Sequence, residues 1–249
     1  MIVLFTDFGL HGPYVGQMKA ALAREAPDIP VIDLMADAPT FNPRAAAYLL
    51  AACVREFPEN AVFLCVVDPG VGSDRLPLTV QAGGRWYVGP DNGLLSIVLR
   101  RGSPARAWSI TWRPERLSAS FHGRDLFAPV AARLAAGAAP TGQPMPVDAL
   151  HGADWPDDLA EIVYVDAYGN AMTGLRAPLV SRATDILAGG HRVRAARTFS
   201  DVDECQAFWY ENALGLVEIA VNQGHAANAL GLAIGHAIDL TASVSMDRR

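Results

Sequence analysis

Short apolar runs alternate with segments of helical periodicity through the first half of the chain. The expected strands are residues 2–6, 31–35, 61–67 and 107–111, and the expected helices are residues 14–26, 44–57, 93–101 and 125–136. Gly83-Gly84, between further apolar runs, predicts a tight hairpin. Continuous apolar strands separated by helices are typical of parallel sheets that are covered on both faces. We therefore expect a Rossmann-like α/β domain with a mostly parallel sheet over residues 1–140.

The pattern changes after residue 140. Residues 141–158 are rich in proline and poor in periodic apolar positions, which predicts a linker. Beyond them the apolar runs are shorter and closer together, and the turn-forming pair Gly189-Gly190 separates two of them. This spacing predicts a smaller, β-rich, β-barrel-like domain over residues 159–249.

Composition narrows the functional classes. The 249 residues are 51% hydrophobic and 18% charged, with a formal net charge of −6, so no basic surplus favours nucleic acid. No apolar run approaches the roughly 20 residues that span a bilayer, and the first residues lack a signal-peptide pattern. The three cysteines are scattered among apolar neighbours, which indicates reduced core thiols. We expect a cytoplasmic protein that acts on a small molecule, without metal, membrane or nucleic acid.

Two acids stand where predicted strands end. Asp7 follows the run 2–6, and Asp68 follows the run 61–67. In a parallel sheet the carboxyl ends of the strands face the ligand crevice. The two oxygens of a carboxylate there match the vicinal hydroxyls of a ribose, although Asp7 could equally cap a turn or a helix.

The loop that follows Asp68 reads Pro-Gly-Val-Gly-Ser-Asp and ends at Arg75. The guanidinium could keep Asp68 ionised and aim it at a reactant, or the two groups could form a structural ion pair. A phosphate-binding loop is a weaker third interpretation, because neither the P-loop pattern nor a full G-x-G-x-x-G is present.

His122 precedes a predicted helix, in the stretch Phe-His-Gly-Arg-Asp that ends at Asp125. An imidazole at that place could accept a proton from a reactant or donate an orienting hydrogen bond. A purely structural role for the histidine is the alternative.

The second predicted domain opens with Val-Asp-Ala-Tyr-Gly-Asn, which contains Asp166, Tyr168 and Asn170. The acid and the amide could hold the ammonium and carboxylate groups of an amino acid, and Gly-Asn also predicts a hairpin turn. Three amides further on, Asn212, Asn222 and Gln223, could read the edge of a nucleobase or cap strand ends.

Six stretches occur in order along nearly the whole chain. They are T-D-F-G with Y-V-G-Q-M-K in residues 6–19, V-D-P-G-V-G in 67–72, G-P-D-N-G in 89–93, F-H-G-R-D in 121–125, Y-G-N in 168–170 and E-I-A-V-N in 218–222. Together they resemble the S-adenosyl-L-methionine (SAM) hydrolases, also called SAM hydroxide adenosyltransferases, which are relatives of fluorinase and chlorinase. The resemblance implies hydrolysis of SAM to adenosine and methionine with no cofactor, in a homotrimer with active sites between subunits.

The resemblance also implies roles for the residues singled out above. Asp68, Arg75 and His122 fall on the family's water-activating trio, and Asp7 falls on its ribose-binding acid. Asp166 and Asn170 would meet the methionine end, with Tyr168 near the adenosine. Asn212 and the backbone of residues 221–223, which include Asn222 and Gln223, would lie by the adenine.

Three other activities stay open: a SAM-dependent halogenase, a sensor that binds SAM or adenosine, and a hydrolase of another nucleoside-like substrate on the same scaffold. A halogenase would hold halide where fluorinase has a serine, and the matching residue here is Gly123, beside His122. Fluorinase also has an inserted loop where this chain has only Gly83-Gly84, and the halogenases lack the trio, so water is the favoured nucleophile. A sensor that binds SAM without cleaving it would have no need of a water-activating trio. One departure from the family is Gly12, where members often have an acid.

Overall fold

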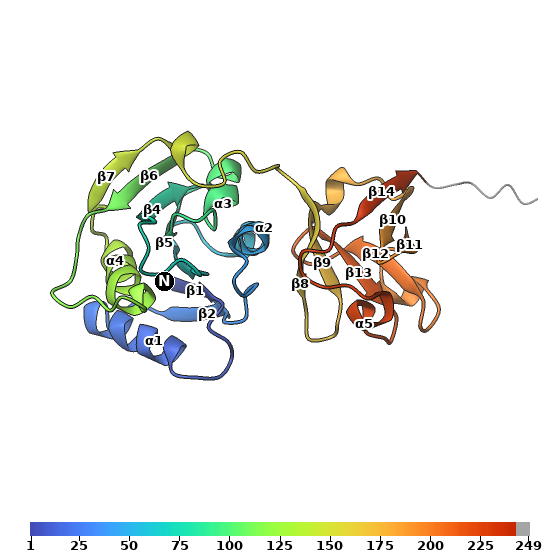
Figure 1. Ribbon diagram of the computed structural model, residues 1–249, viewed down its shortest axis with the longest axis horizontal. Helices are drawn as coiled ribbons and strands as arrows, with labels where there is room; N and C mark the ends of the chain where they lie inside the picture. Colours follow the sequence, from blue (N-terminus) through green and yellow to red (C-terminus); the bar gives the residue numbers. More distant parts are fainter. Residues whose placement is uncertain (243–249) are drawn as a thin grey trace, which may run out of the picture. The chain divides into compact units, whose positions relative to one another are not determined.

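The computed structural model describes residues 1–242 and divides into two compact units, Met1–Asp157 and a second that begins at Asp158 (Figure 1). Each unit contains a seven-stranded sheet. Residues 243–249, the end of the predicted second domain, lie outside the described part.

The sheet of the first unit has the strand order β2-β1-β3-β5-β4-β6-β7. The strands are β1 (Ile2–Thr6), β2 (Val31–Met35), β3 (Val62–Val66), β4 (Pro77–Ala82), β5 (Arg85–Pro90), β6 (Ala105–Ile110) and β7 (Gly142–Met145). The helices are α1 (Tyr14–Glu25), α2 (Pro43–Cys53), α3 (Ser96–Arg101) and α4 (Ala128–Ala135).

This sheet is mixed, so the expectation of a mostly parallel, Rossmann-like sheet is not confirmed. Strands β2, β1, β3 and β5 are parallel, whereas β4, β6 and β7 pair antiparallel with their neighbours. The physical reason is the predicted Gly83-Gly84 turn, which leaves two residues between β4 and β5. Two residues can join antiparallel strands only, because a parallel crossover needs a dozen or more.

The predicted linker 141–158 is also corrected. Its residues 142–145 form β7, which pairs with β6 at the edge of the first sheet. Further along, the Tyr48 hydroxyl donates to the carbonyl of Pro156 over 2.5 Å, and the guanidinium of Arg100 binds the Asp157 carboxylate over 3.0 Å. Proline-rich composition marked the absence of a helix here, but backbone pairing and these side-chain contacts hold the segment in the first unit.

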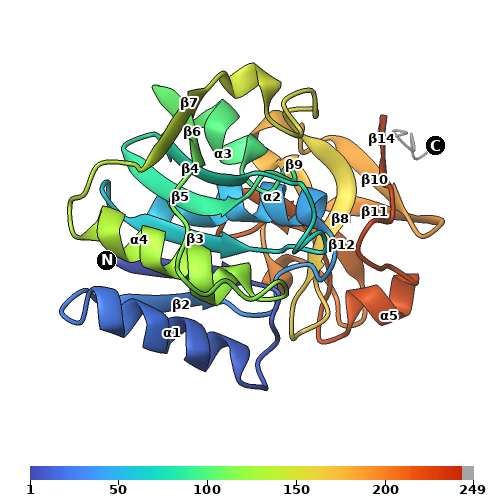
Figure 2. The same ribbon diagram turned by 60° about the vertical axis from the view of Figure 1, so that its left-hand side comes forward.

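Helices cover both faces of the first sheet. Figure 2 shows α1 and α4 side by side on one face, and the two helices contact each other. Ile2 and Leu4 of β1 pack with Met18 and Phe127 on that side, and Val3 and Phe5, which alternate with them, are equally buried. This burial on both faces explains why β1 reads as a continuous apolar run instead of an alternating one.

The second unit is a mixed seven-stranded sheet of order β14-β10-β11-β12-β13-β9-β8, curled into a half-barrel. Its elements are β8 (Leu159–Val165), β9 (Ala171–Arg176), β10 (Thr184–Ala188), β11 (His191–Ala195), β12 (Ala207–Glu211), β13 (Leu216–Val221), α5 (Ala226–Leu230) and β14 (Asp239–Ala242). Because the sheet curls, its edge strands β8 and β14 contact the same stretch of chain. Ile238 N–H donates to the Ala160 carbonyl of β8, and β14, which begins at the next residue, pairs with β10.

Trp209 anchors the core of the second unit. It is 1% exposed, and its indole N–H donates to the Thr184 carbonyl over 2.9 Å. Trp209→Ala should therefore lower the free energy of unfolding by about 3–5 kcal/mol, as large-to-small core substitutions of Trp do. Urea unfolding followed by circular dichroism measures this. Leu240→Ala, at a side chain that is 48% exposed, is the control and should stay within about 0.5 kcal/mol.

Candidate active site

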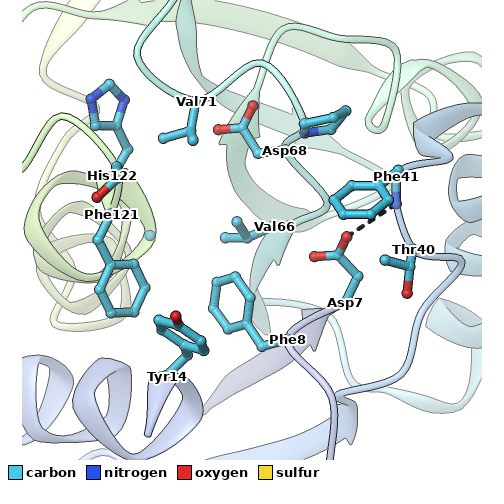
Figure 3. Close-up of a pocket in the computed structure, with 13 residues that line it drawn as sticks. Asp7, Phe8, Tyr14, Thr40, Phe41, Val66, Asp68, Val71, Phe121 and His122 are labelled. Atoms are coloured by element: carbon cyan, nitrogen blue, oxygen red, sulfur yellow. Dashed lines mark hydrogen bonds between the residues drawn. The ribbon is translucent and has the colours of Figure 1, made fainter. Parts of the chain in front are cut away.

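The parallel pairing of β1 with β3 brings the two strand-end acids together. The register places Thr6 opposite Val66, and the Asp7 N–H donates to the Val66 carbonyl over 3.3 Å. Asp7 and Asp68 therefore emerge at the same edge of the sheet. Both line a cavity of about 370 Å³, together with Phe8, Tyr14, Thr40, Phe41, Val66, Pro69, Val71, Ser120, Phe121, His122 and Gly123 (Figure 3).

Asp68 and Arg75 form a buried, two-pronged ion pair. Arg75 Nε donates to Asp68 Oδ1 over 2.9 Å, and Arg75 Nη2 donates to Asp68 Oδ2. Their side chains are only 4% and 8% exposed respectively. The intervening loop folds back through two turns, in which Val71 N–H donates to the Asp68 carbonyl and Ser73 N–H to that of Gly70. The loop 69–74 thus brings the Arg75 guanidinium at its end back to the Asp68 carboxylate at its start.

His122 completes a connected trio. Arg75 Nη2 lies 3.0 Å from His122 Nδ1. Because arginine does not lose its proton in proteins, the guanidinium is the donor and Nδ1 the acceptor, so the imidazole is neutral and has its proton on Nε2. Burial, and then the positive charge of Arg75, lower the pKa of His122 below its usual value of 6.5. The same contact thus fixes both the charge and the tautomer of the ring.

A π-helical turn, Gly123–Phe127, sets the position of His122 ahead of α4. Such turns are rare and frequently occur at functional sites. Phe127 lies under the Arg75 guanidinium, 5.3 Å from ring centroid to Cζ, and so supports the trio from below. A Cβ added to Gly123 would approach Met18 Sδ to 3.3 Å and Phe8 Cζ to 3.4 Å, so a side chain there would crowd the wall of the cavity.

Asp7 faces the same cavity as the trio. Its Oδ2 accepts a hydrogen bond from the Phe41 backbone N–H over 3.3 Å, drawn as a dashed line in Figure 3. Burial raises the pKa of Asp7, the Phe41 hydrogen bond opposes that rise, and the nearby charge of Asp68 adds to it. Phe41 is 76% exposed and has a φ of 58°, in the left-handed region that a residue with a bulky side chain rarely adopts.

An aromatic wall that the sequence analysis did not predict lies across the cavity from Asp68 (Figure 3). The rings of Phe8, Tyr14 and Phe121 pack against one another with centroids 5.4–5.7 Å apart. The sequence offered one clue to these rings: Phe8 directly follows Asp7, and Phe121 directly precedes His122. The cavity therefore combines an apolar wall with charged groups on the opposite side.

The second unit contains a separate hollow of about 700 Å³. It is lined by Asp166, Tyr168, Asn170, Phe199, Tyr210, Val221, Gln223, Gly224 and His225. Asp166 Oδ1 accepts from the backbone N–H groups of Tyr168 and Asn170 over 2.9 Å each, and Oδ2 accepts from Asn170 Nδ2 over 3.2 Å. The predicted turn is therefore present and also forms one wall of a hollow.

The three predicted amides are not all brought together. Asn212 is 8% exposed, and its Oδ1 caps the turn between β12 and β13 by accepting from the N–H groups of Leu214 and Leu216. Asn222 donates to the Val202 carbonyl over 2.9 Å, and neither side chain lines the hollow. Gln223 does line it, with Nε2 bonded to Glu204 Oε1 over 3.0 Å. Phe199, Tyr210 and His225 line it without having been predicted.

The three cysteines differ in their burial. Cys53 and Cys65 are buried free thiols, and burial raises the pKa of Cys53 to about 12. Cys205 is exposed, which corrects its expected place in the core: it precedes β12 in a turn with φ of 61°.

Within residues 1–242 no group of three or more His, Cys, Asp or Glu side chains could hold a metal ion. No helix in the described part of the chain is long and apolar enough to cross a membrane.

Comparisons with known proteins cover both units. The profile of the SAM hydroxide adenosyltransferase N-terminal domain matches residues 2–143, and that of the C-terminal domain matches residues 160–239. The chain is 42% identical to an (R)-S-adenosyl-L-methionine hydrolase of Thermus thermophilus, over 96% of this chain and 98% of the relative. An enzyme of the same name from Salinispora arenicola is 38% identical, over 95% and 96%.

Solved structures and more distant relatives agree with these matches. The crystal structure of an uncharacterized conserved protein from Thermotoga maritima superposes with a TM-score of 0.87 at 31% identity, over 96% of this chain and 99% of that one. A fluorinase of Nocardia brasiliensis is 24% identical over 55% of this chain. The two domain matches and the full-length hydrolase relatives show that the chain belongs to the SAM hydroxide adenosyltransferase family.

Proposed function

We propose that this enzyme hydrolyses S-adenosyl-L-methionine to adenosine and L-methionine. The observation that carries the proposal is the Asp68–Arg75–His122 trio at the cavity that Asp7 also lines. The names of the hydrolase relatives supply the substrate, and they specify its (R) form.

The reaction needs a nucleophile more than it needs an acid. A water oxygen attacks the ribose C5′, the C5′–S bond breaks, and its electron pair neutralises the sulfonium to the thioether of methionine. The oxygen becomes the 5′-hydroxyl of adenosine, and the second water proton is released. Because the leaving group departs neutral, no proton needs to be delivered to sulfur, and the site's task is to hold the water in line and accept its proton.

The hydrogen bonds within the trio indicate a separate role for each of its three residues. His122 has its proton on Nε2, so it acts as the donor that orients the water oxygen, one of the two roles its sequence position allowed. Asp68 has lone pairs left beyond the two bonds to Arg75 and acts as the proton acceptor. Arg75 holds both groups and stabilises hydroxide character on the water.

The remaining predicted residues are assigned to binding. Asp7 accepts the ribose hydroxyls, and Asp166 with Asn170 receives the methionine end, with Tyr168 beside the adenosine. For the adenine, the assignment of Asn212 and of the backbone of residues 221–223, which include Asn222 and Gln223, stays a prediction. The homotrimer with active sites between subunits and the cytoplasmic location stay predictions.

A halogenase and a sensor are the competing functions. Against the halogenase, the water-activating trio is present and the turn between β4 and β5 has two residues only. Gly123 also lacks the hydroxyl that holds halide in fluorinase, although chlorinase tolerates glycine there, so Gly123 alone does not decide. Against the sensor, burying the Asp68–Arg75 ion pair costs desolvation free energy, which only near-ideal geometry offsets. A site that only binds a ligand does not need such a pair.

Incubating the purified chain with SAM, followed by chromatography, separates these functions. We expect adenosine and methionine in equal amounts, from the (R) form in particular. A 5′-halogenated adenosine formed with added fluoride or chloride would show a halogenase. A thermal shift with SAM but no product would show a sensor.

Asp68→Asn should lower kcat by about 10²–10⁴-fold, the range for loss of general acid–base catalysis. The amide keeps the size of the side chain but cannot accept the proton. Single-turnover formation of adenosine measures the effect. Asp74→Asn removes an exposed acid of the same loop and should leave the rate unchanged. Near wild-type turnover in Asp68→Asn would contradict the assignment.

Turnover should fall at acid pH through His122. Protonation of Nδ1 would place a second cation against Arg75 and break their hydrogen bond, so activity is lost as pH falls through the His122 pKa. Since that pKa is lowered, the enzyme should remain active at pH 6.5 and lose activity below it. Steady-state rates across pH 4.5–8 would check this, and His122→Gln, which keeps a donor, should lose this acid limb. A midpoint above 6.5 would be inconsistent with the structure.

A further inference from the structure

Glu218, in the middle of β13, is a buried acid that the hydrolysis does not use. It is 2% exposed. Its Oε1 accepts from the Tyr210 hydroxyl over 2.5 Å, and its Oε2 accepts from Asn212 Nδ2 over 2.7 Å. The Asn212 amide cannot be turned around, because its Oδ1 already accepts from two backbone N–H groups. Both Glu218 oxygens are therefore acceptors, as in an ionised carboxylate.

No cation offsets this carboxylate within the described residues. Its two hydrogen-bond partners, Tyr210 and Asn212, are uncharged, and Glu218 has no part in the ion pairs of Asp158, Asp185 and Asp201 in this unit. Burial raises the pKa of Glu218, its two hydrogen bonds oppose the rise, and the charge of Asp166 adds to it. A buried charge without a counter-charge is costly, so a cationic group that arrives with a ligand would stabilise it.

Tyr210 connects Glu218 to the hollow. Tyr210 lines the hollow with Asp166, and its hydroxyl proton is already given to Glu218. The phenol therefore offers only oxygen lone pairs to a ligand, and Asp166 offers carboxylate oxygens. These two lining groups accept hydrogen bonds, and the Glu218 charge behind the phenol strengthens the negative potential there.

We propose that Glu218 is a positioning residue that, through Tyr210, makes this hollow selective for a ligand with an ammonium group. The ligand class is an adenosyl amino acid, as opposed to a plain nucleoside. The proposal rests on the proposed function, since it assumes that the hollow receives the amino-acid end of the substrate.

Two uncleaved ligands test the selectivity by calorimetry on the full chain. S-adenosyl-L-homocysteine has the amino-acid end, and 5′-methylthioadenosine lacks it. Glu218→Gln should weaken S-adenosyl-L-homocysteine about tenfold, the order for one charge removed at several ångströms in a partly buried site. Binding of 5′-methylthioadenosine should change less than twofold. In the same Glu218→Gln variant, the KM for SAM should also rise about tenfold, with kcat nearly unchanged.

Two further variants make the test specific. Glu211→Gln removes the same charge from the exposed end of β12, and it should leave both affinities unaltered. Tyr210→Phe keeps the ring but removes the hydroxyl that donates to Glu218, so it should weaken the binding of S-adenosyl-L-homocysteine selectively. This variant replaces Glu218→Gln in the test if Glu218→Gln does not fold.

Equal weakening of both ligands, or of neither, would overturn the role of Glu218. If the wild type still released adenosine from SAM in that case, the proposed function would stand and the selectivity alone would fail. If the wild type bound neither ligand and cleaved no SAM, both proposals would fall together.

Discussion

The buried ion pair between Asp68 and Arg75 is the constraint on which the candidate site depends. Both side chains are almost fully shielded from water, and two hydrogen bonds join them in the fork geometry that suits guanidinium and carboxylate. Removing either partner would leave the other charged and buried, which is strongly destabilising. The pair therefore fixes the loop 69–74, the orientation of the carboxylate and, through Nη2, the tautomer of His122.

The sheet supplies the rigidity that this arrangement needs. Asp68 follows a strand that is buried along its whole length, and β1 beside it delivers Asp7 to the same edge. His122 comes from a later part of the chain and immediately precedes the π-helical turn Gly123–Phe127, and Phe127 of that turn packs beneath Arg75. Groups from three distant stretches thus meet because each is attached to an element that is packed in the core, which is how a site maintains the precision that in-line attack requires.

The two units differ in what lines their hollows. The cavity of the first unit combines the Asp68 and His122 side chains with an aromatic wall, whereas the hollow of the second unit is lined by an acid, an amide and a phenol that is hydrogen-bonded to the buried Glu218.

Local patterns along the chain were enough to predict strands β1, β2, β3 and β6, the positions of Asp7 and Asp68 at strand ends, the Gly83-Gly84 hairpin and the motifs of the family, because these depend on neighbouring residues. Tertiary structure alone decided that the sheet is mixed, since pairing of β6 with β4 and β7 has no local signature. It also decided that the Arg75 guanidinium meets His122 Nδ1, 47 positions further along the chain, which leaves the ring a donor at Nε2. Each of these depends on which groups meet in space, and hydrogen-bond partners that lie far apart in sequence cannot be read from spacing.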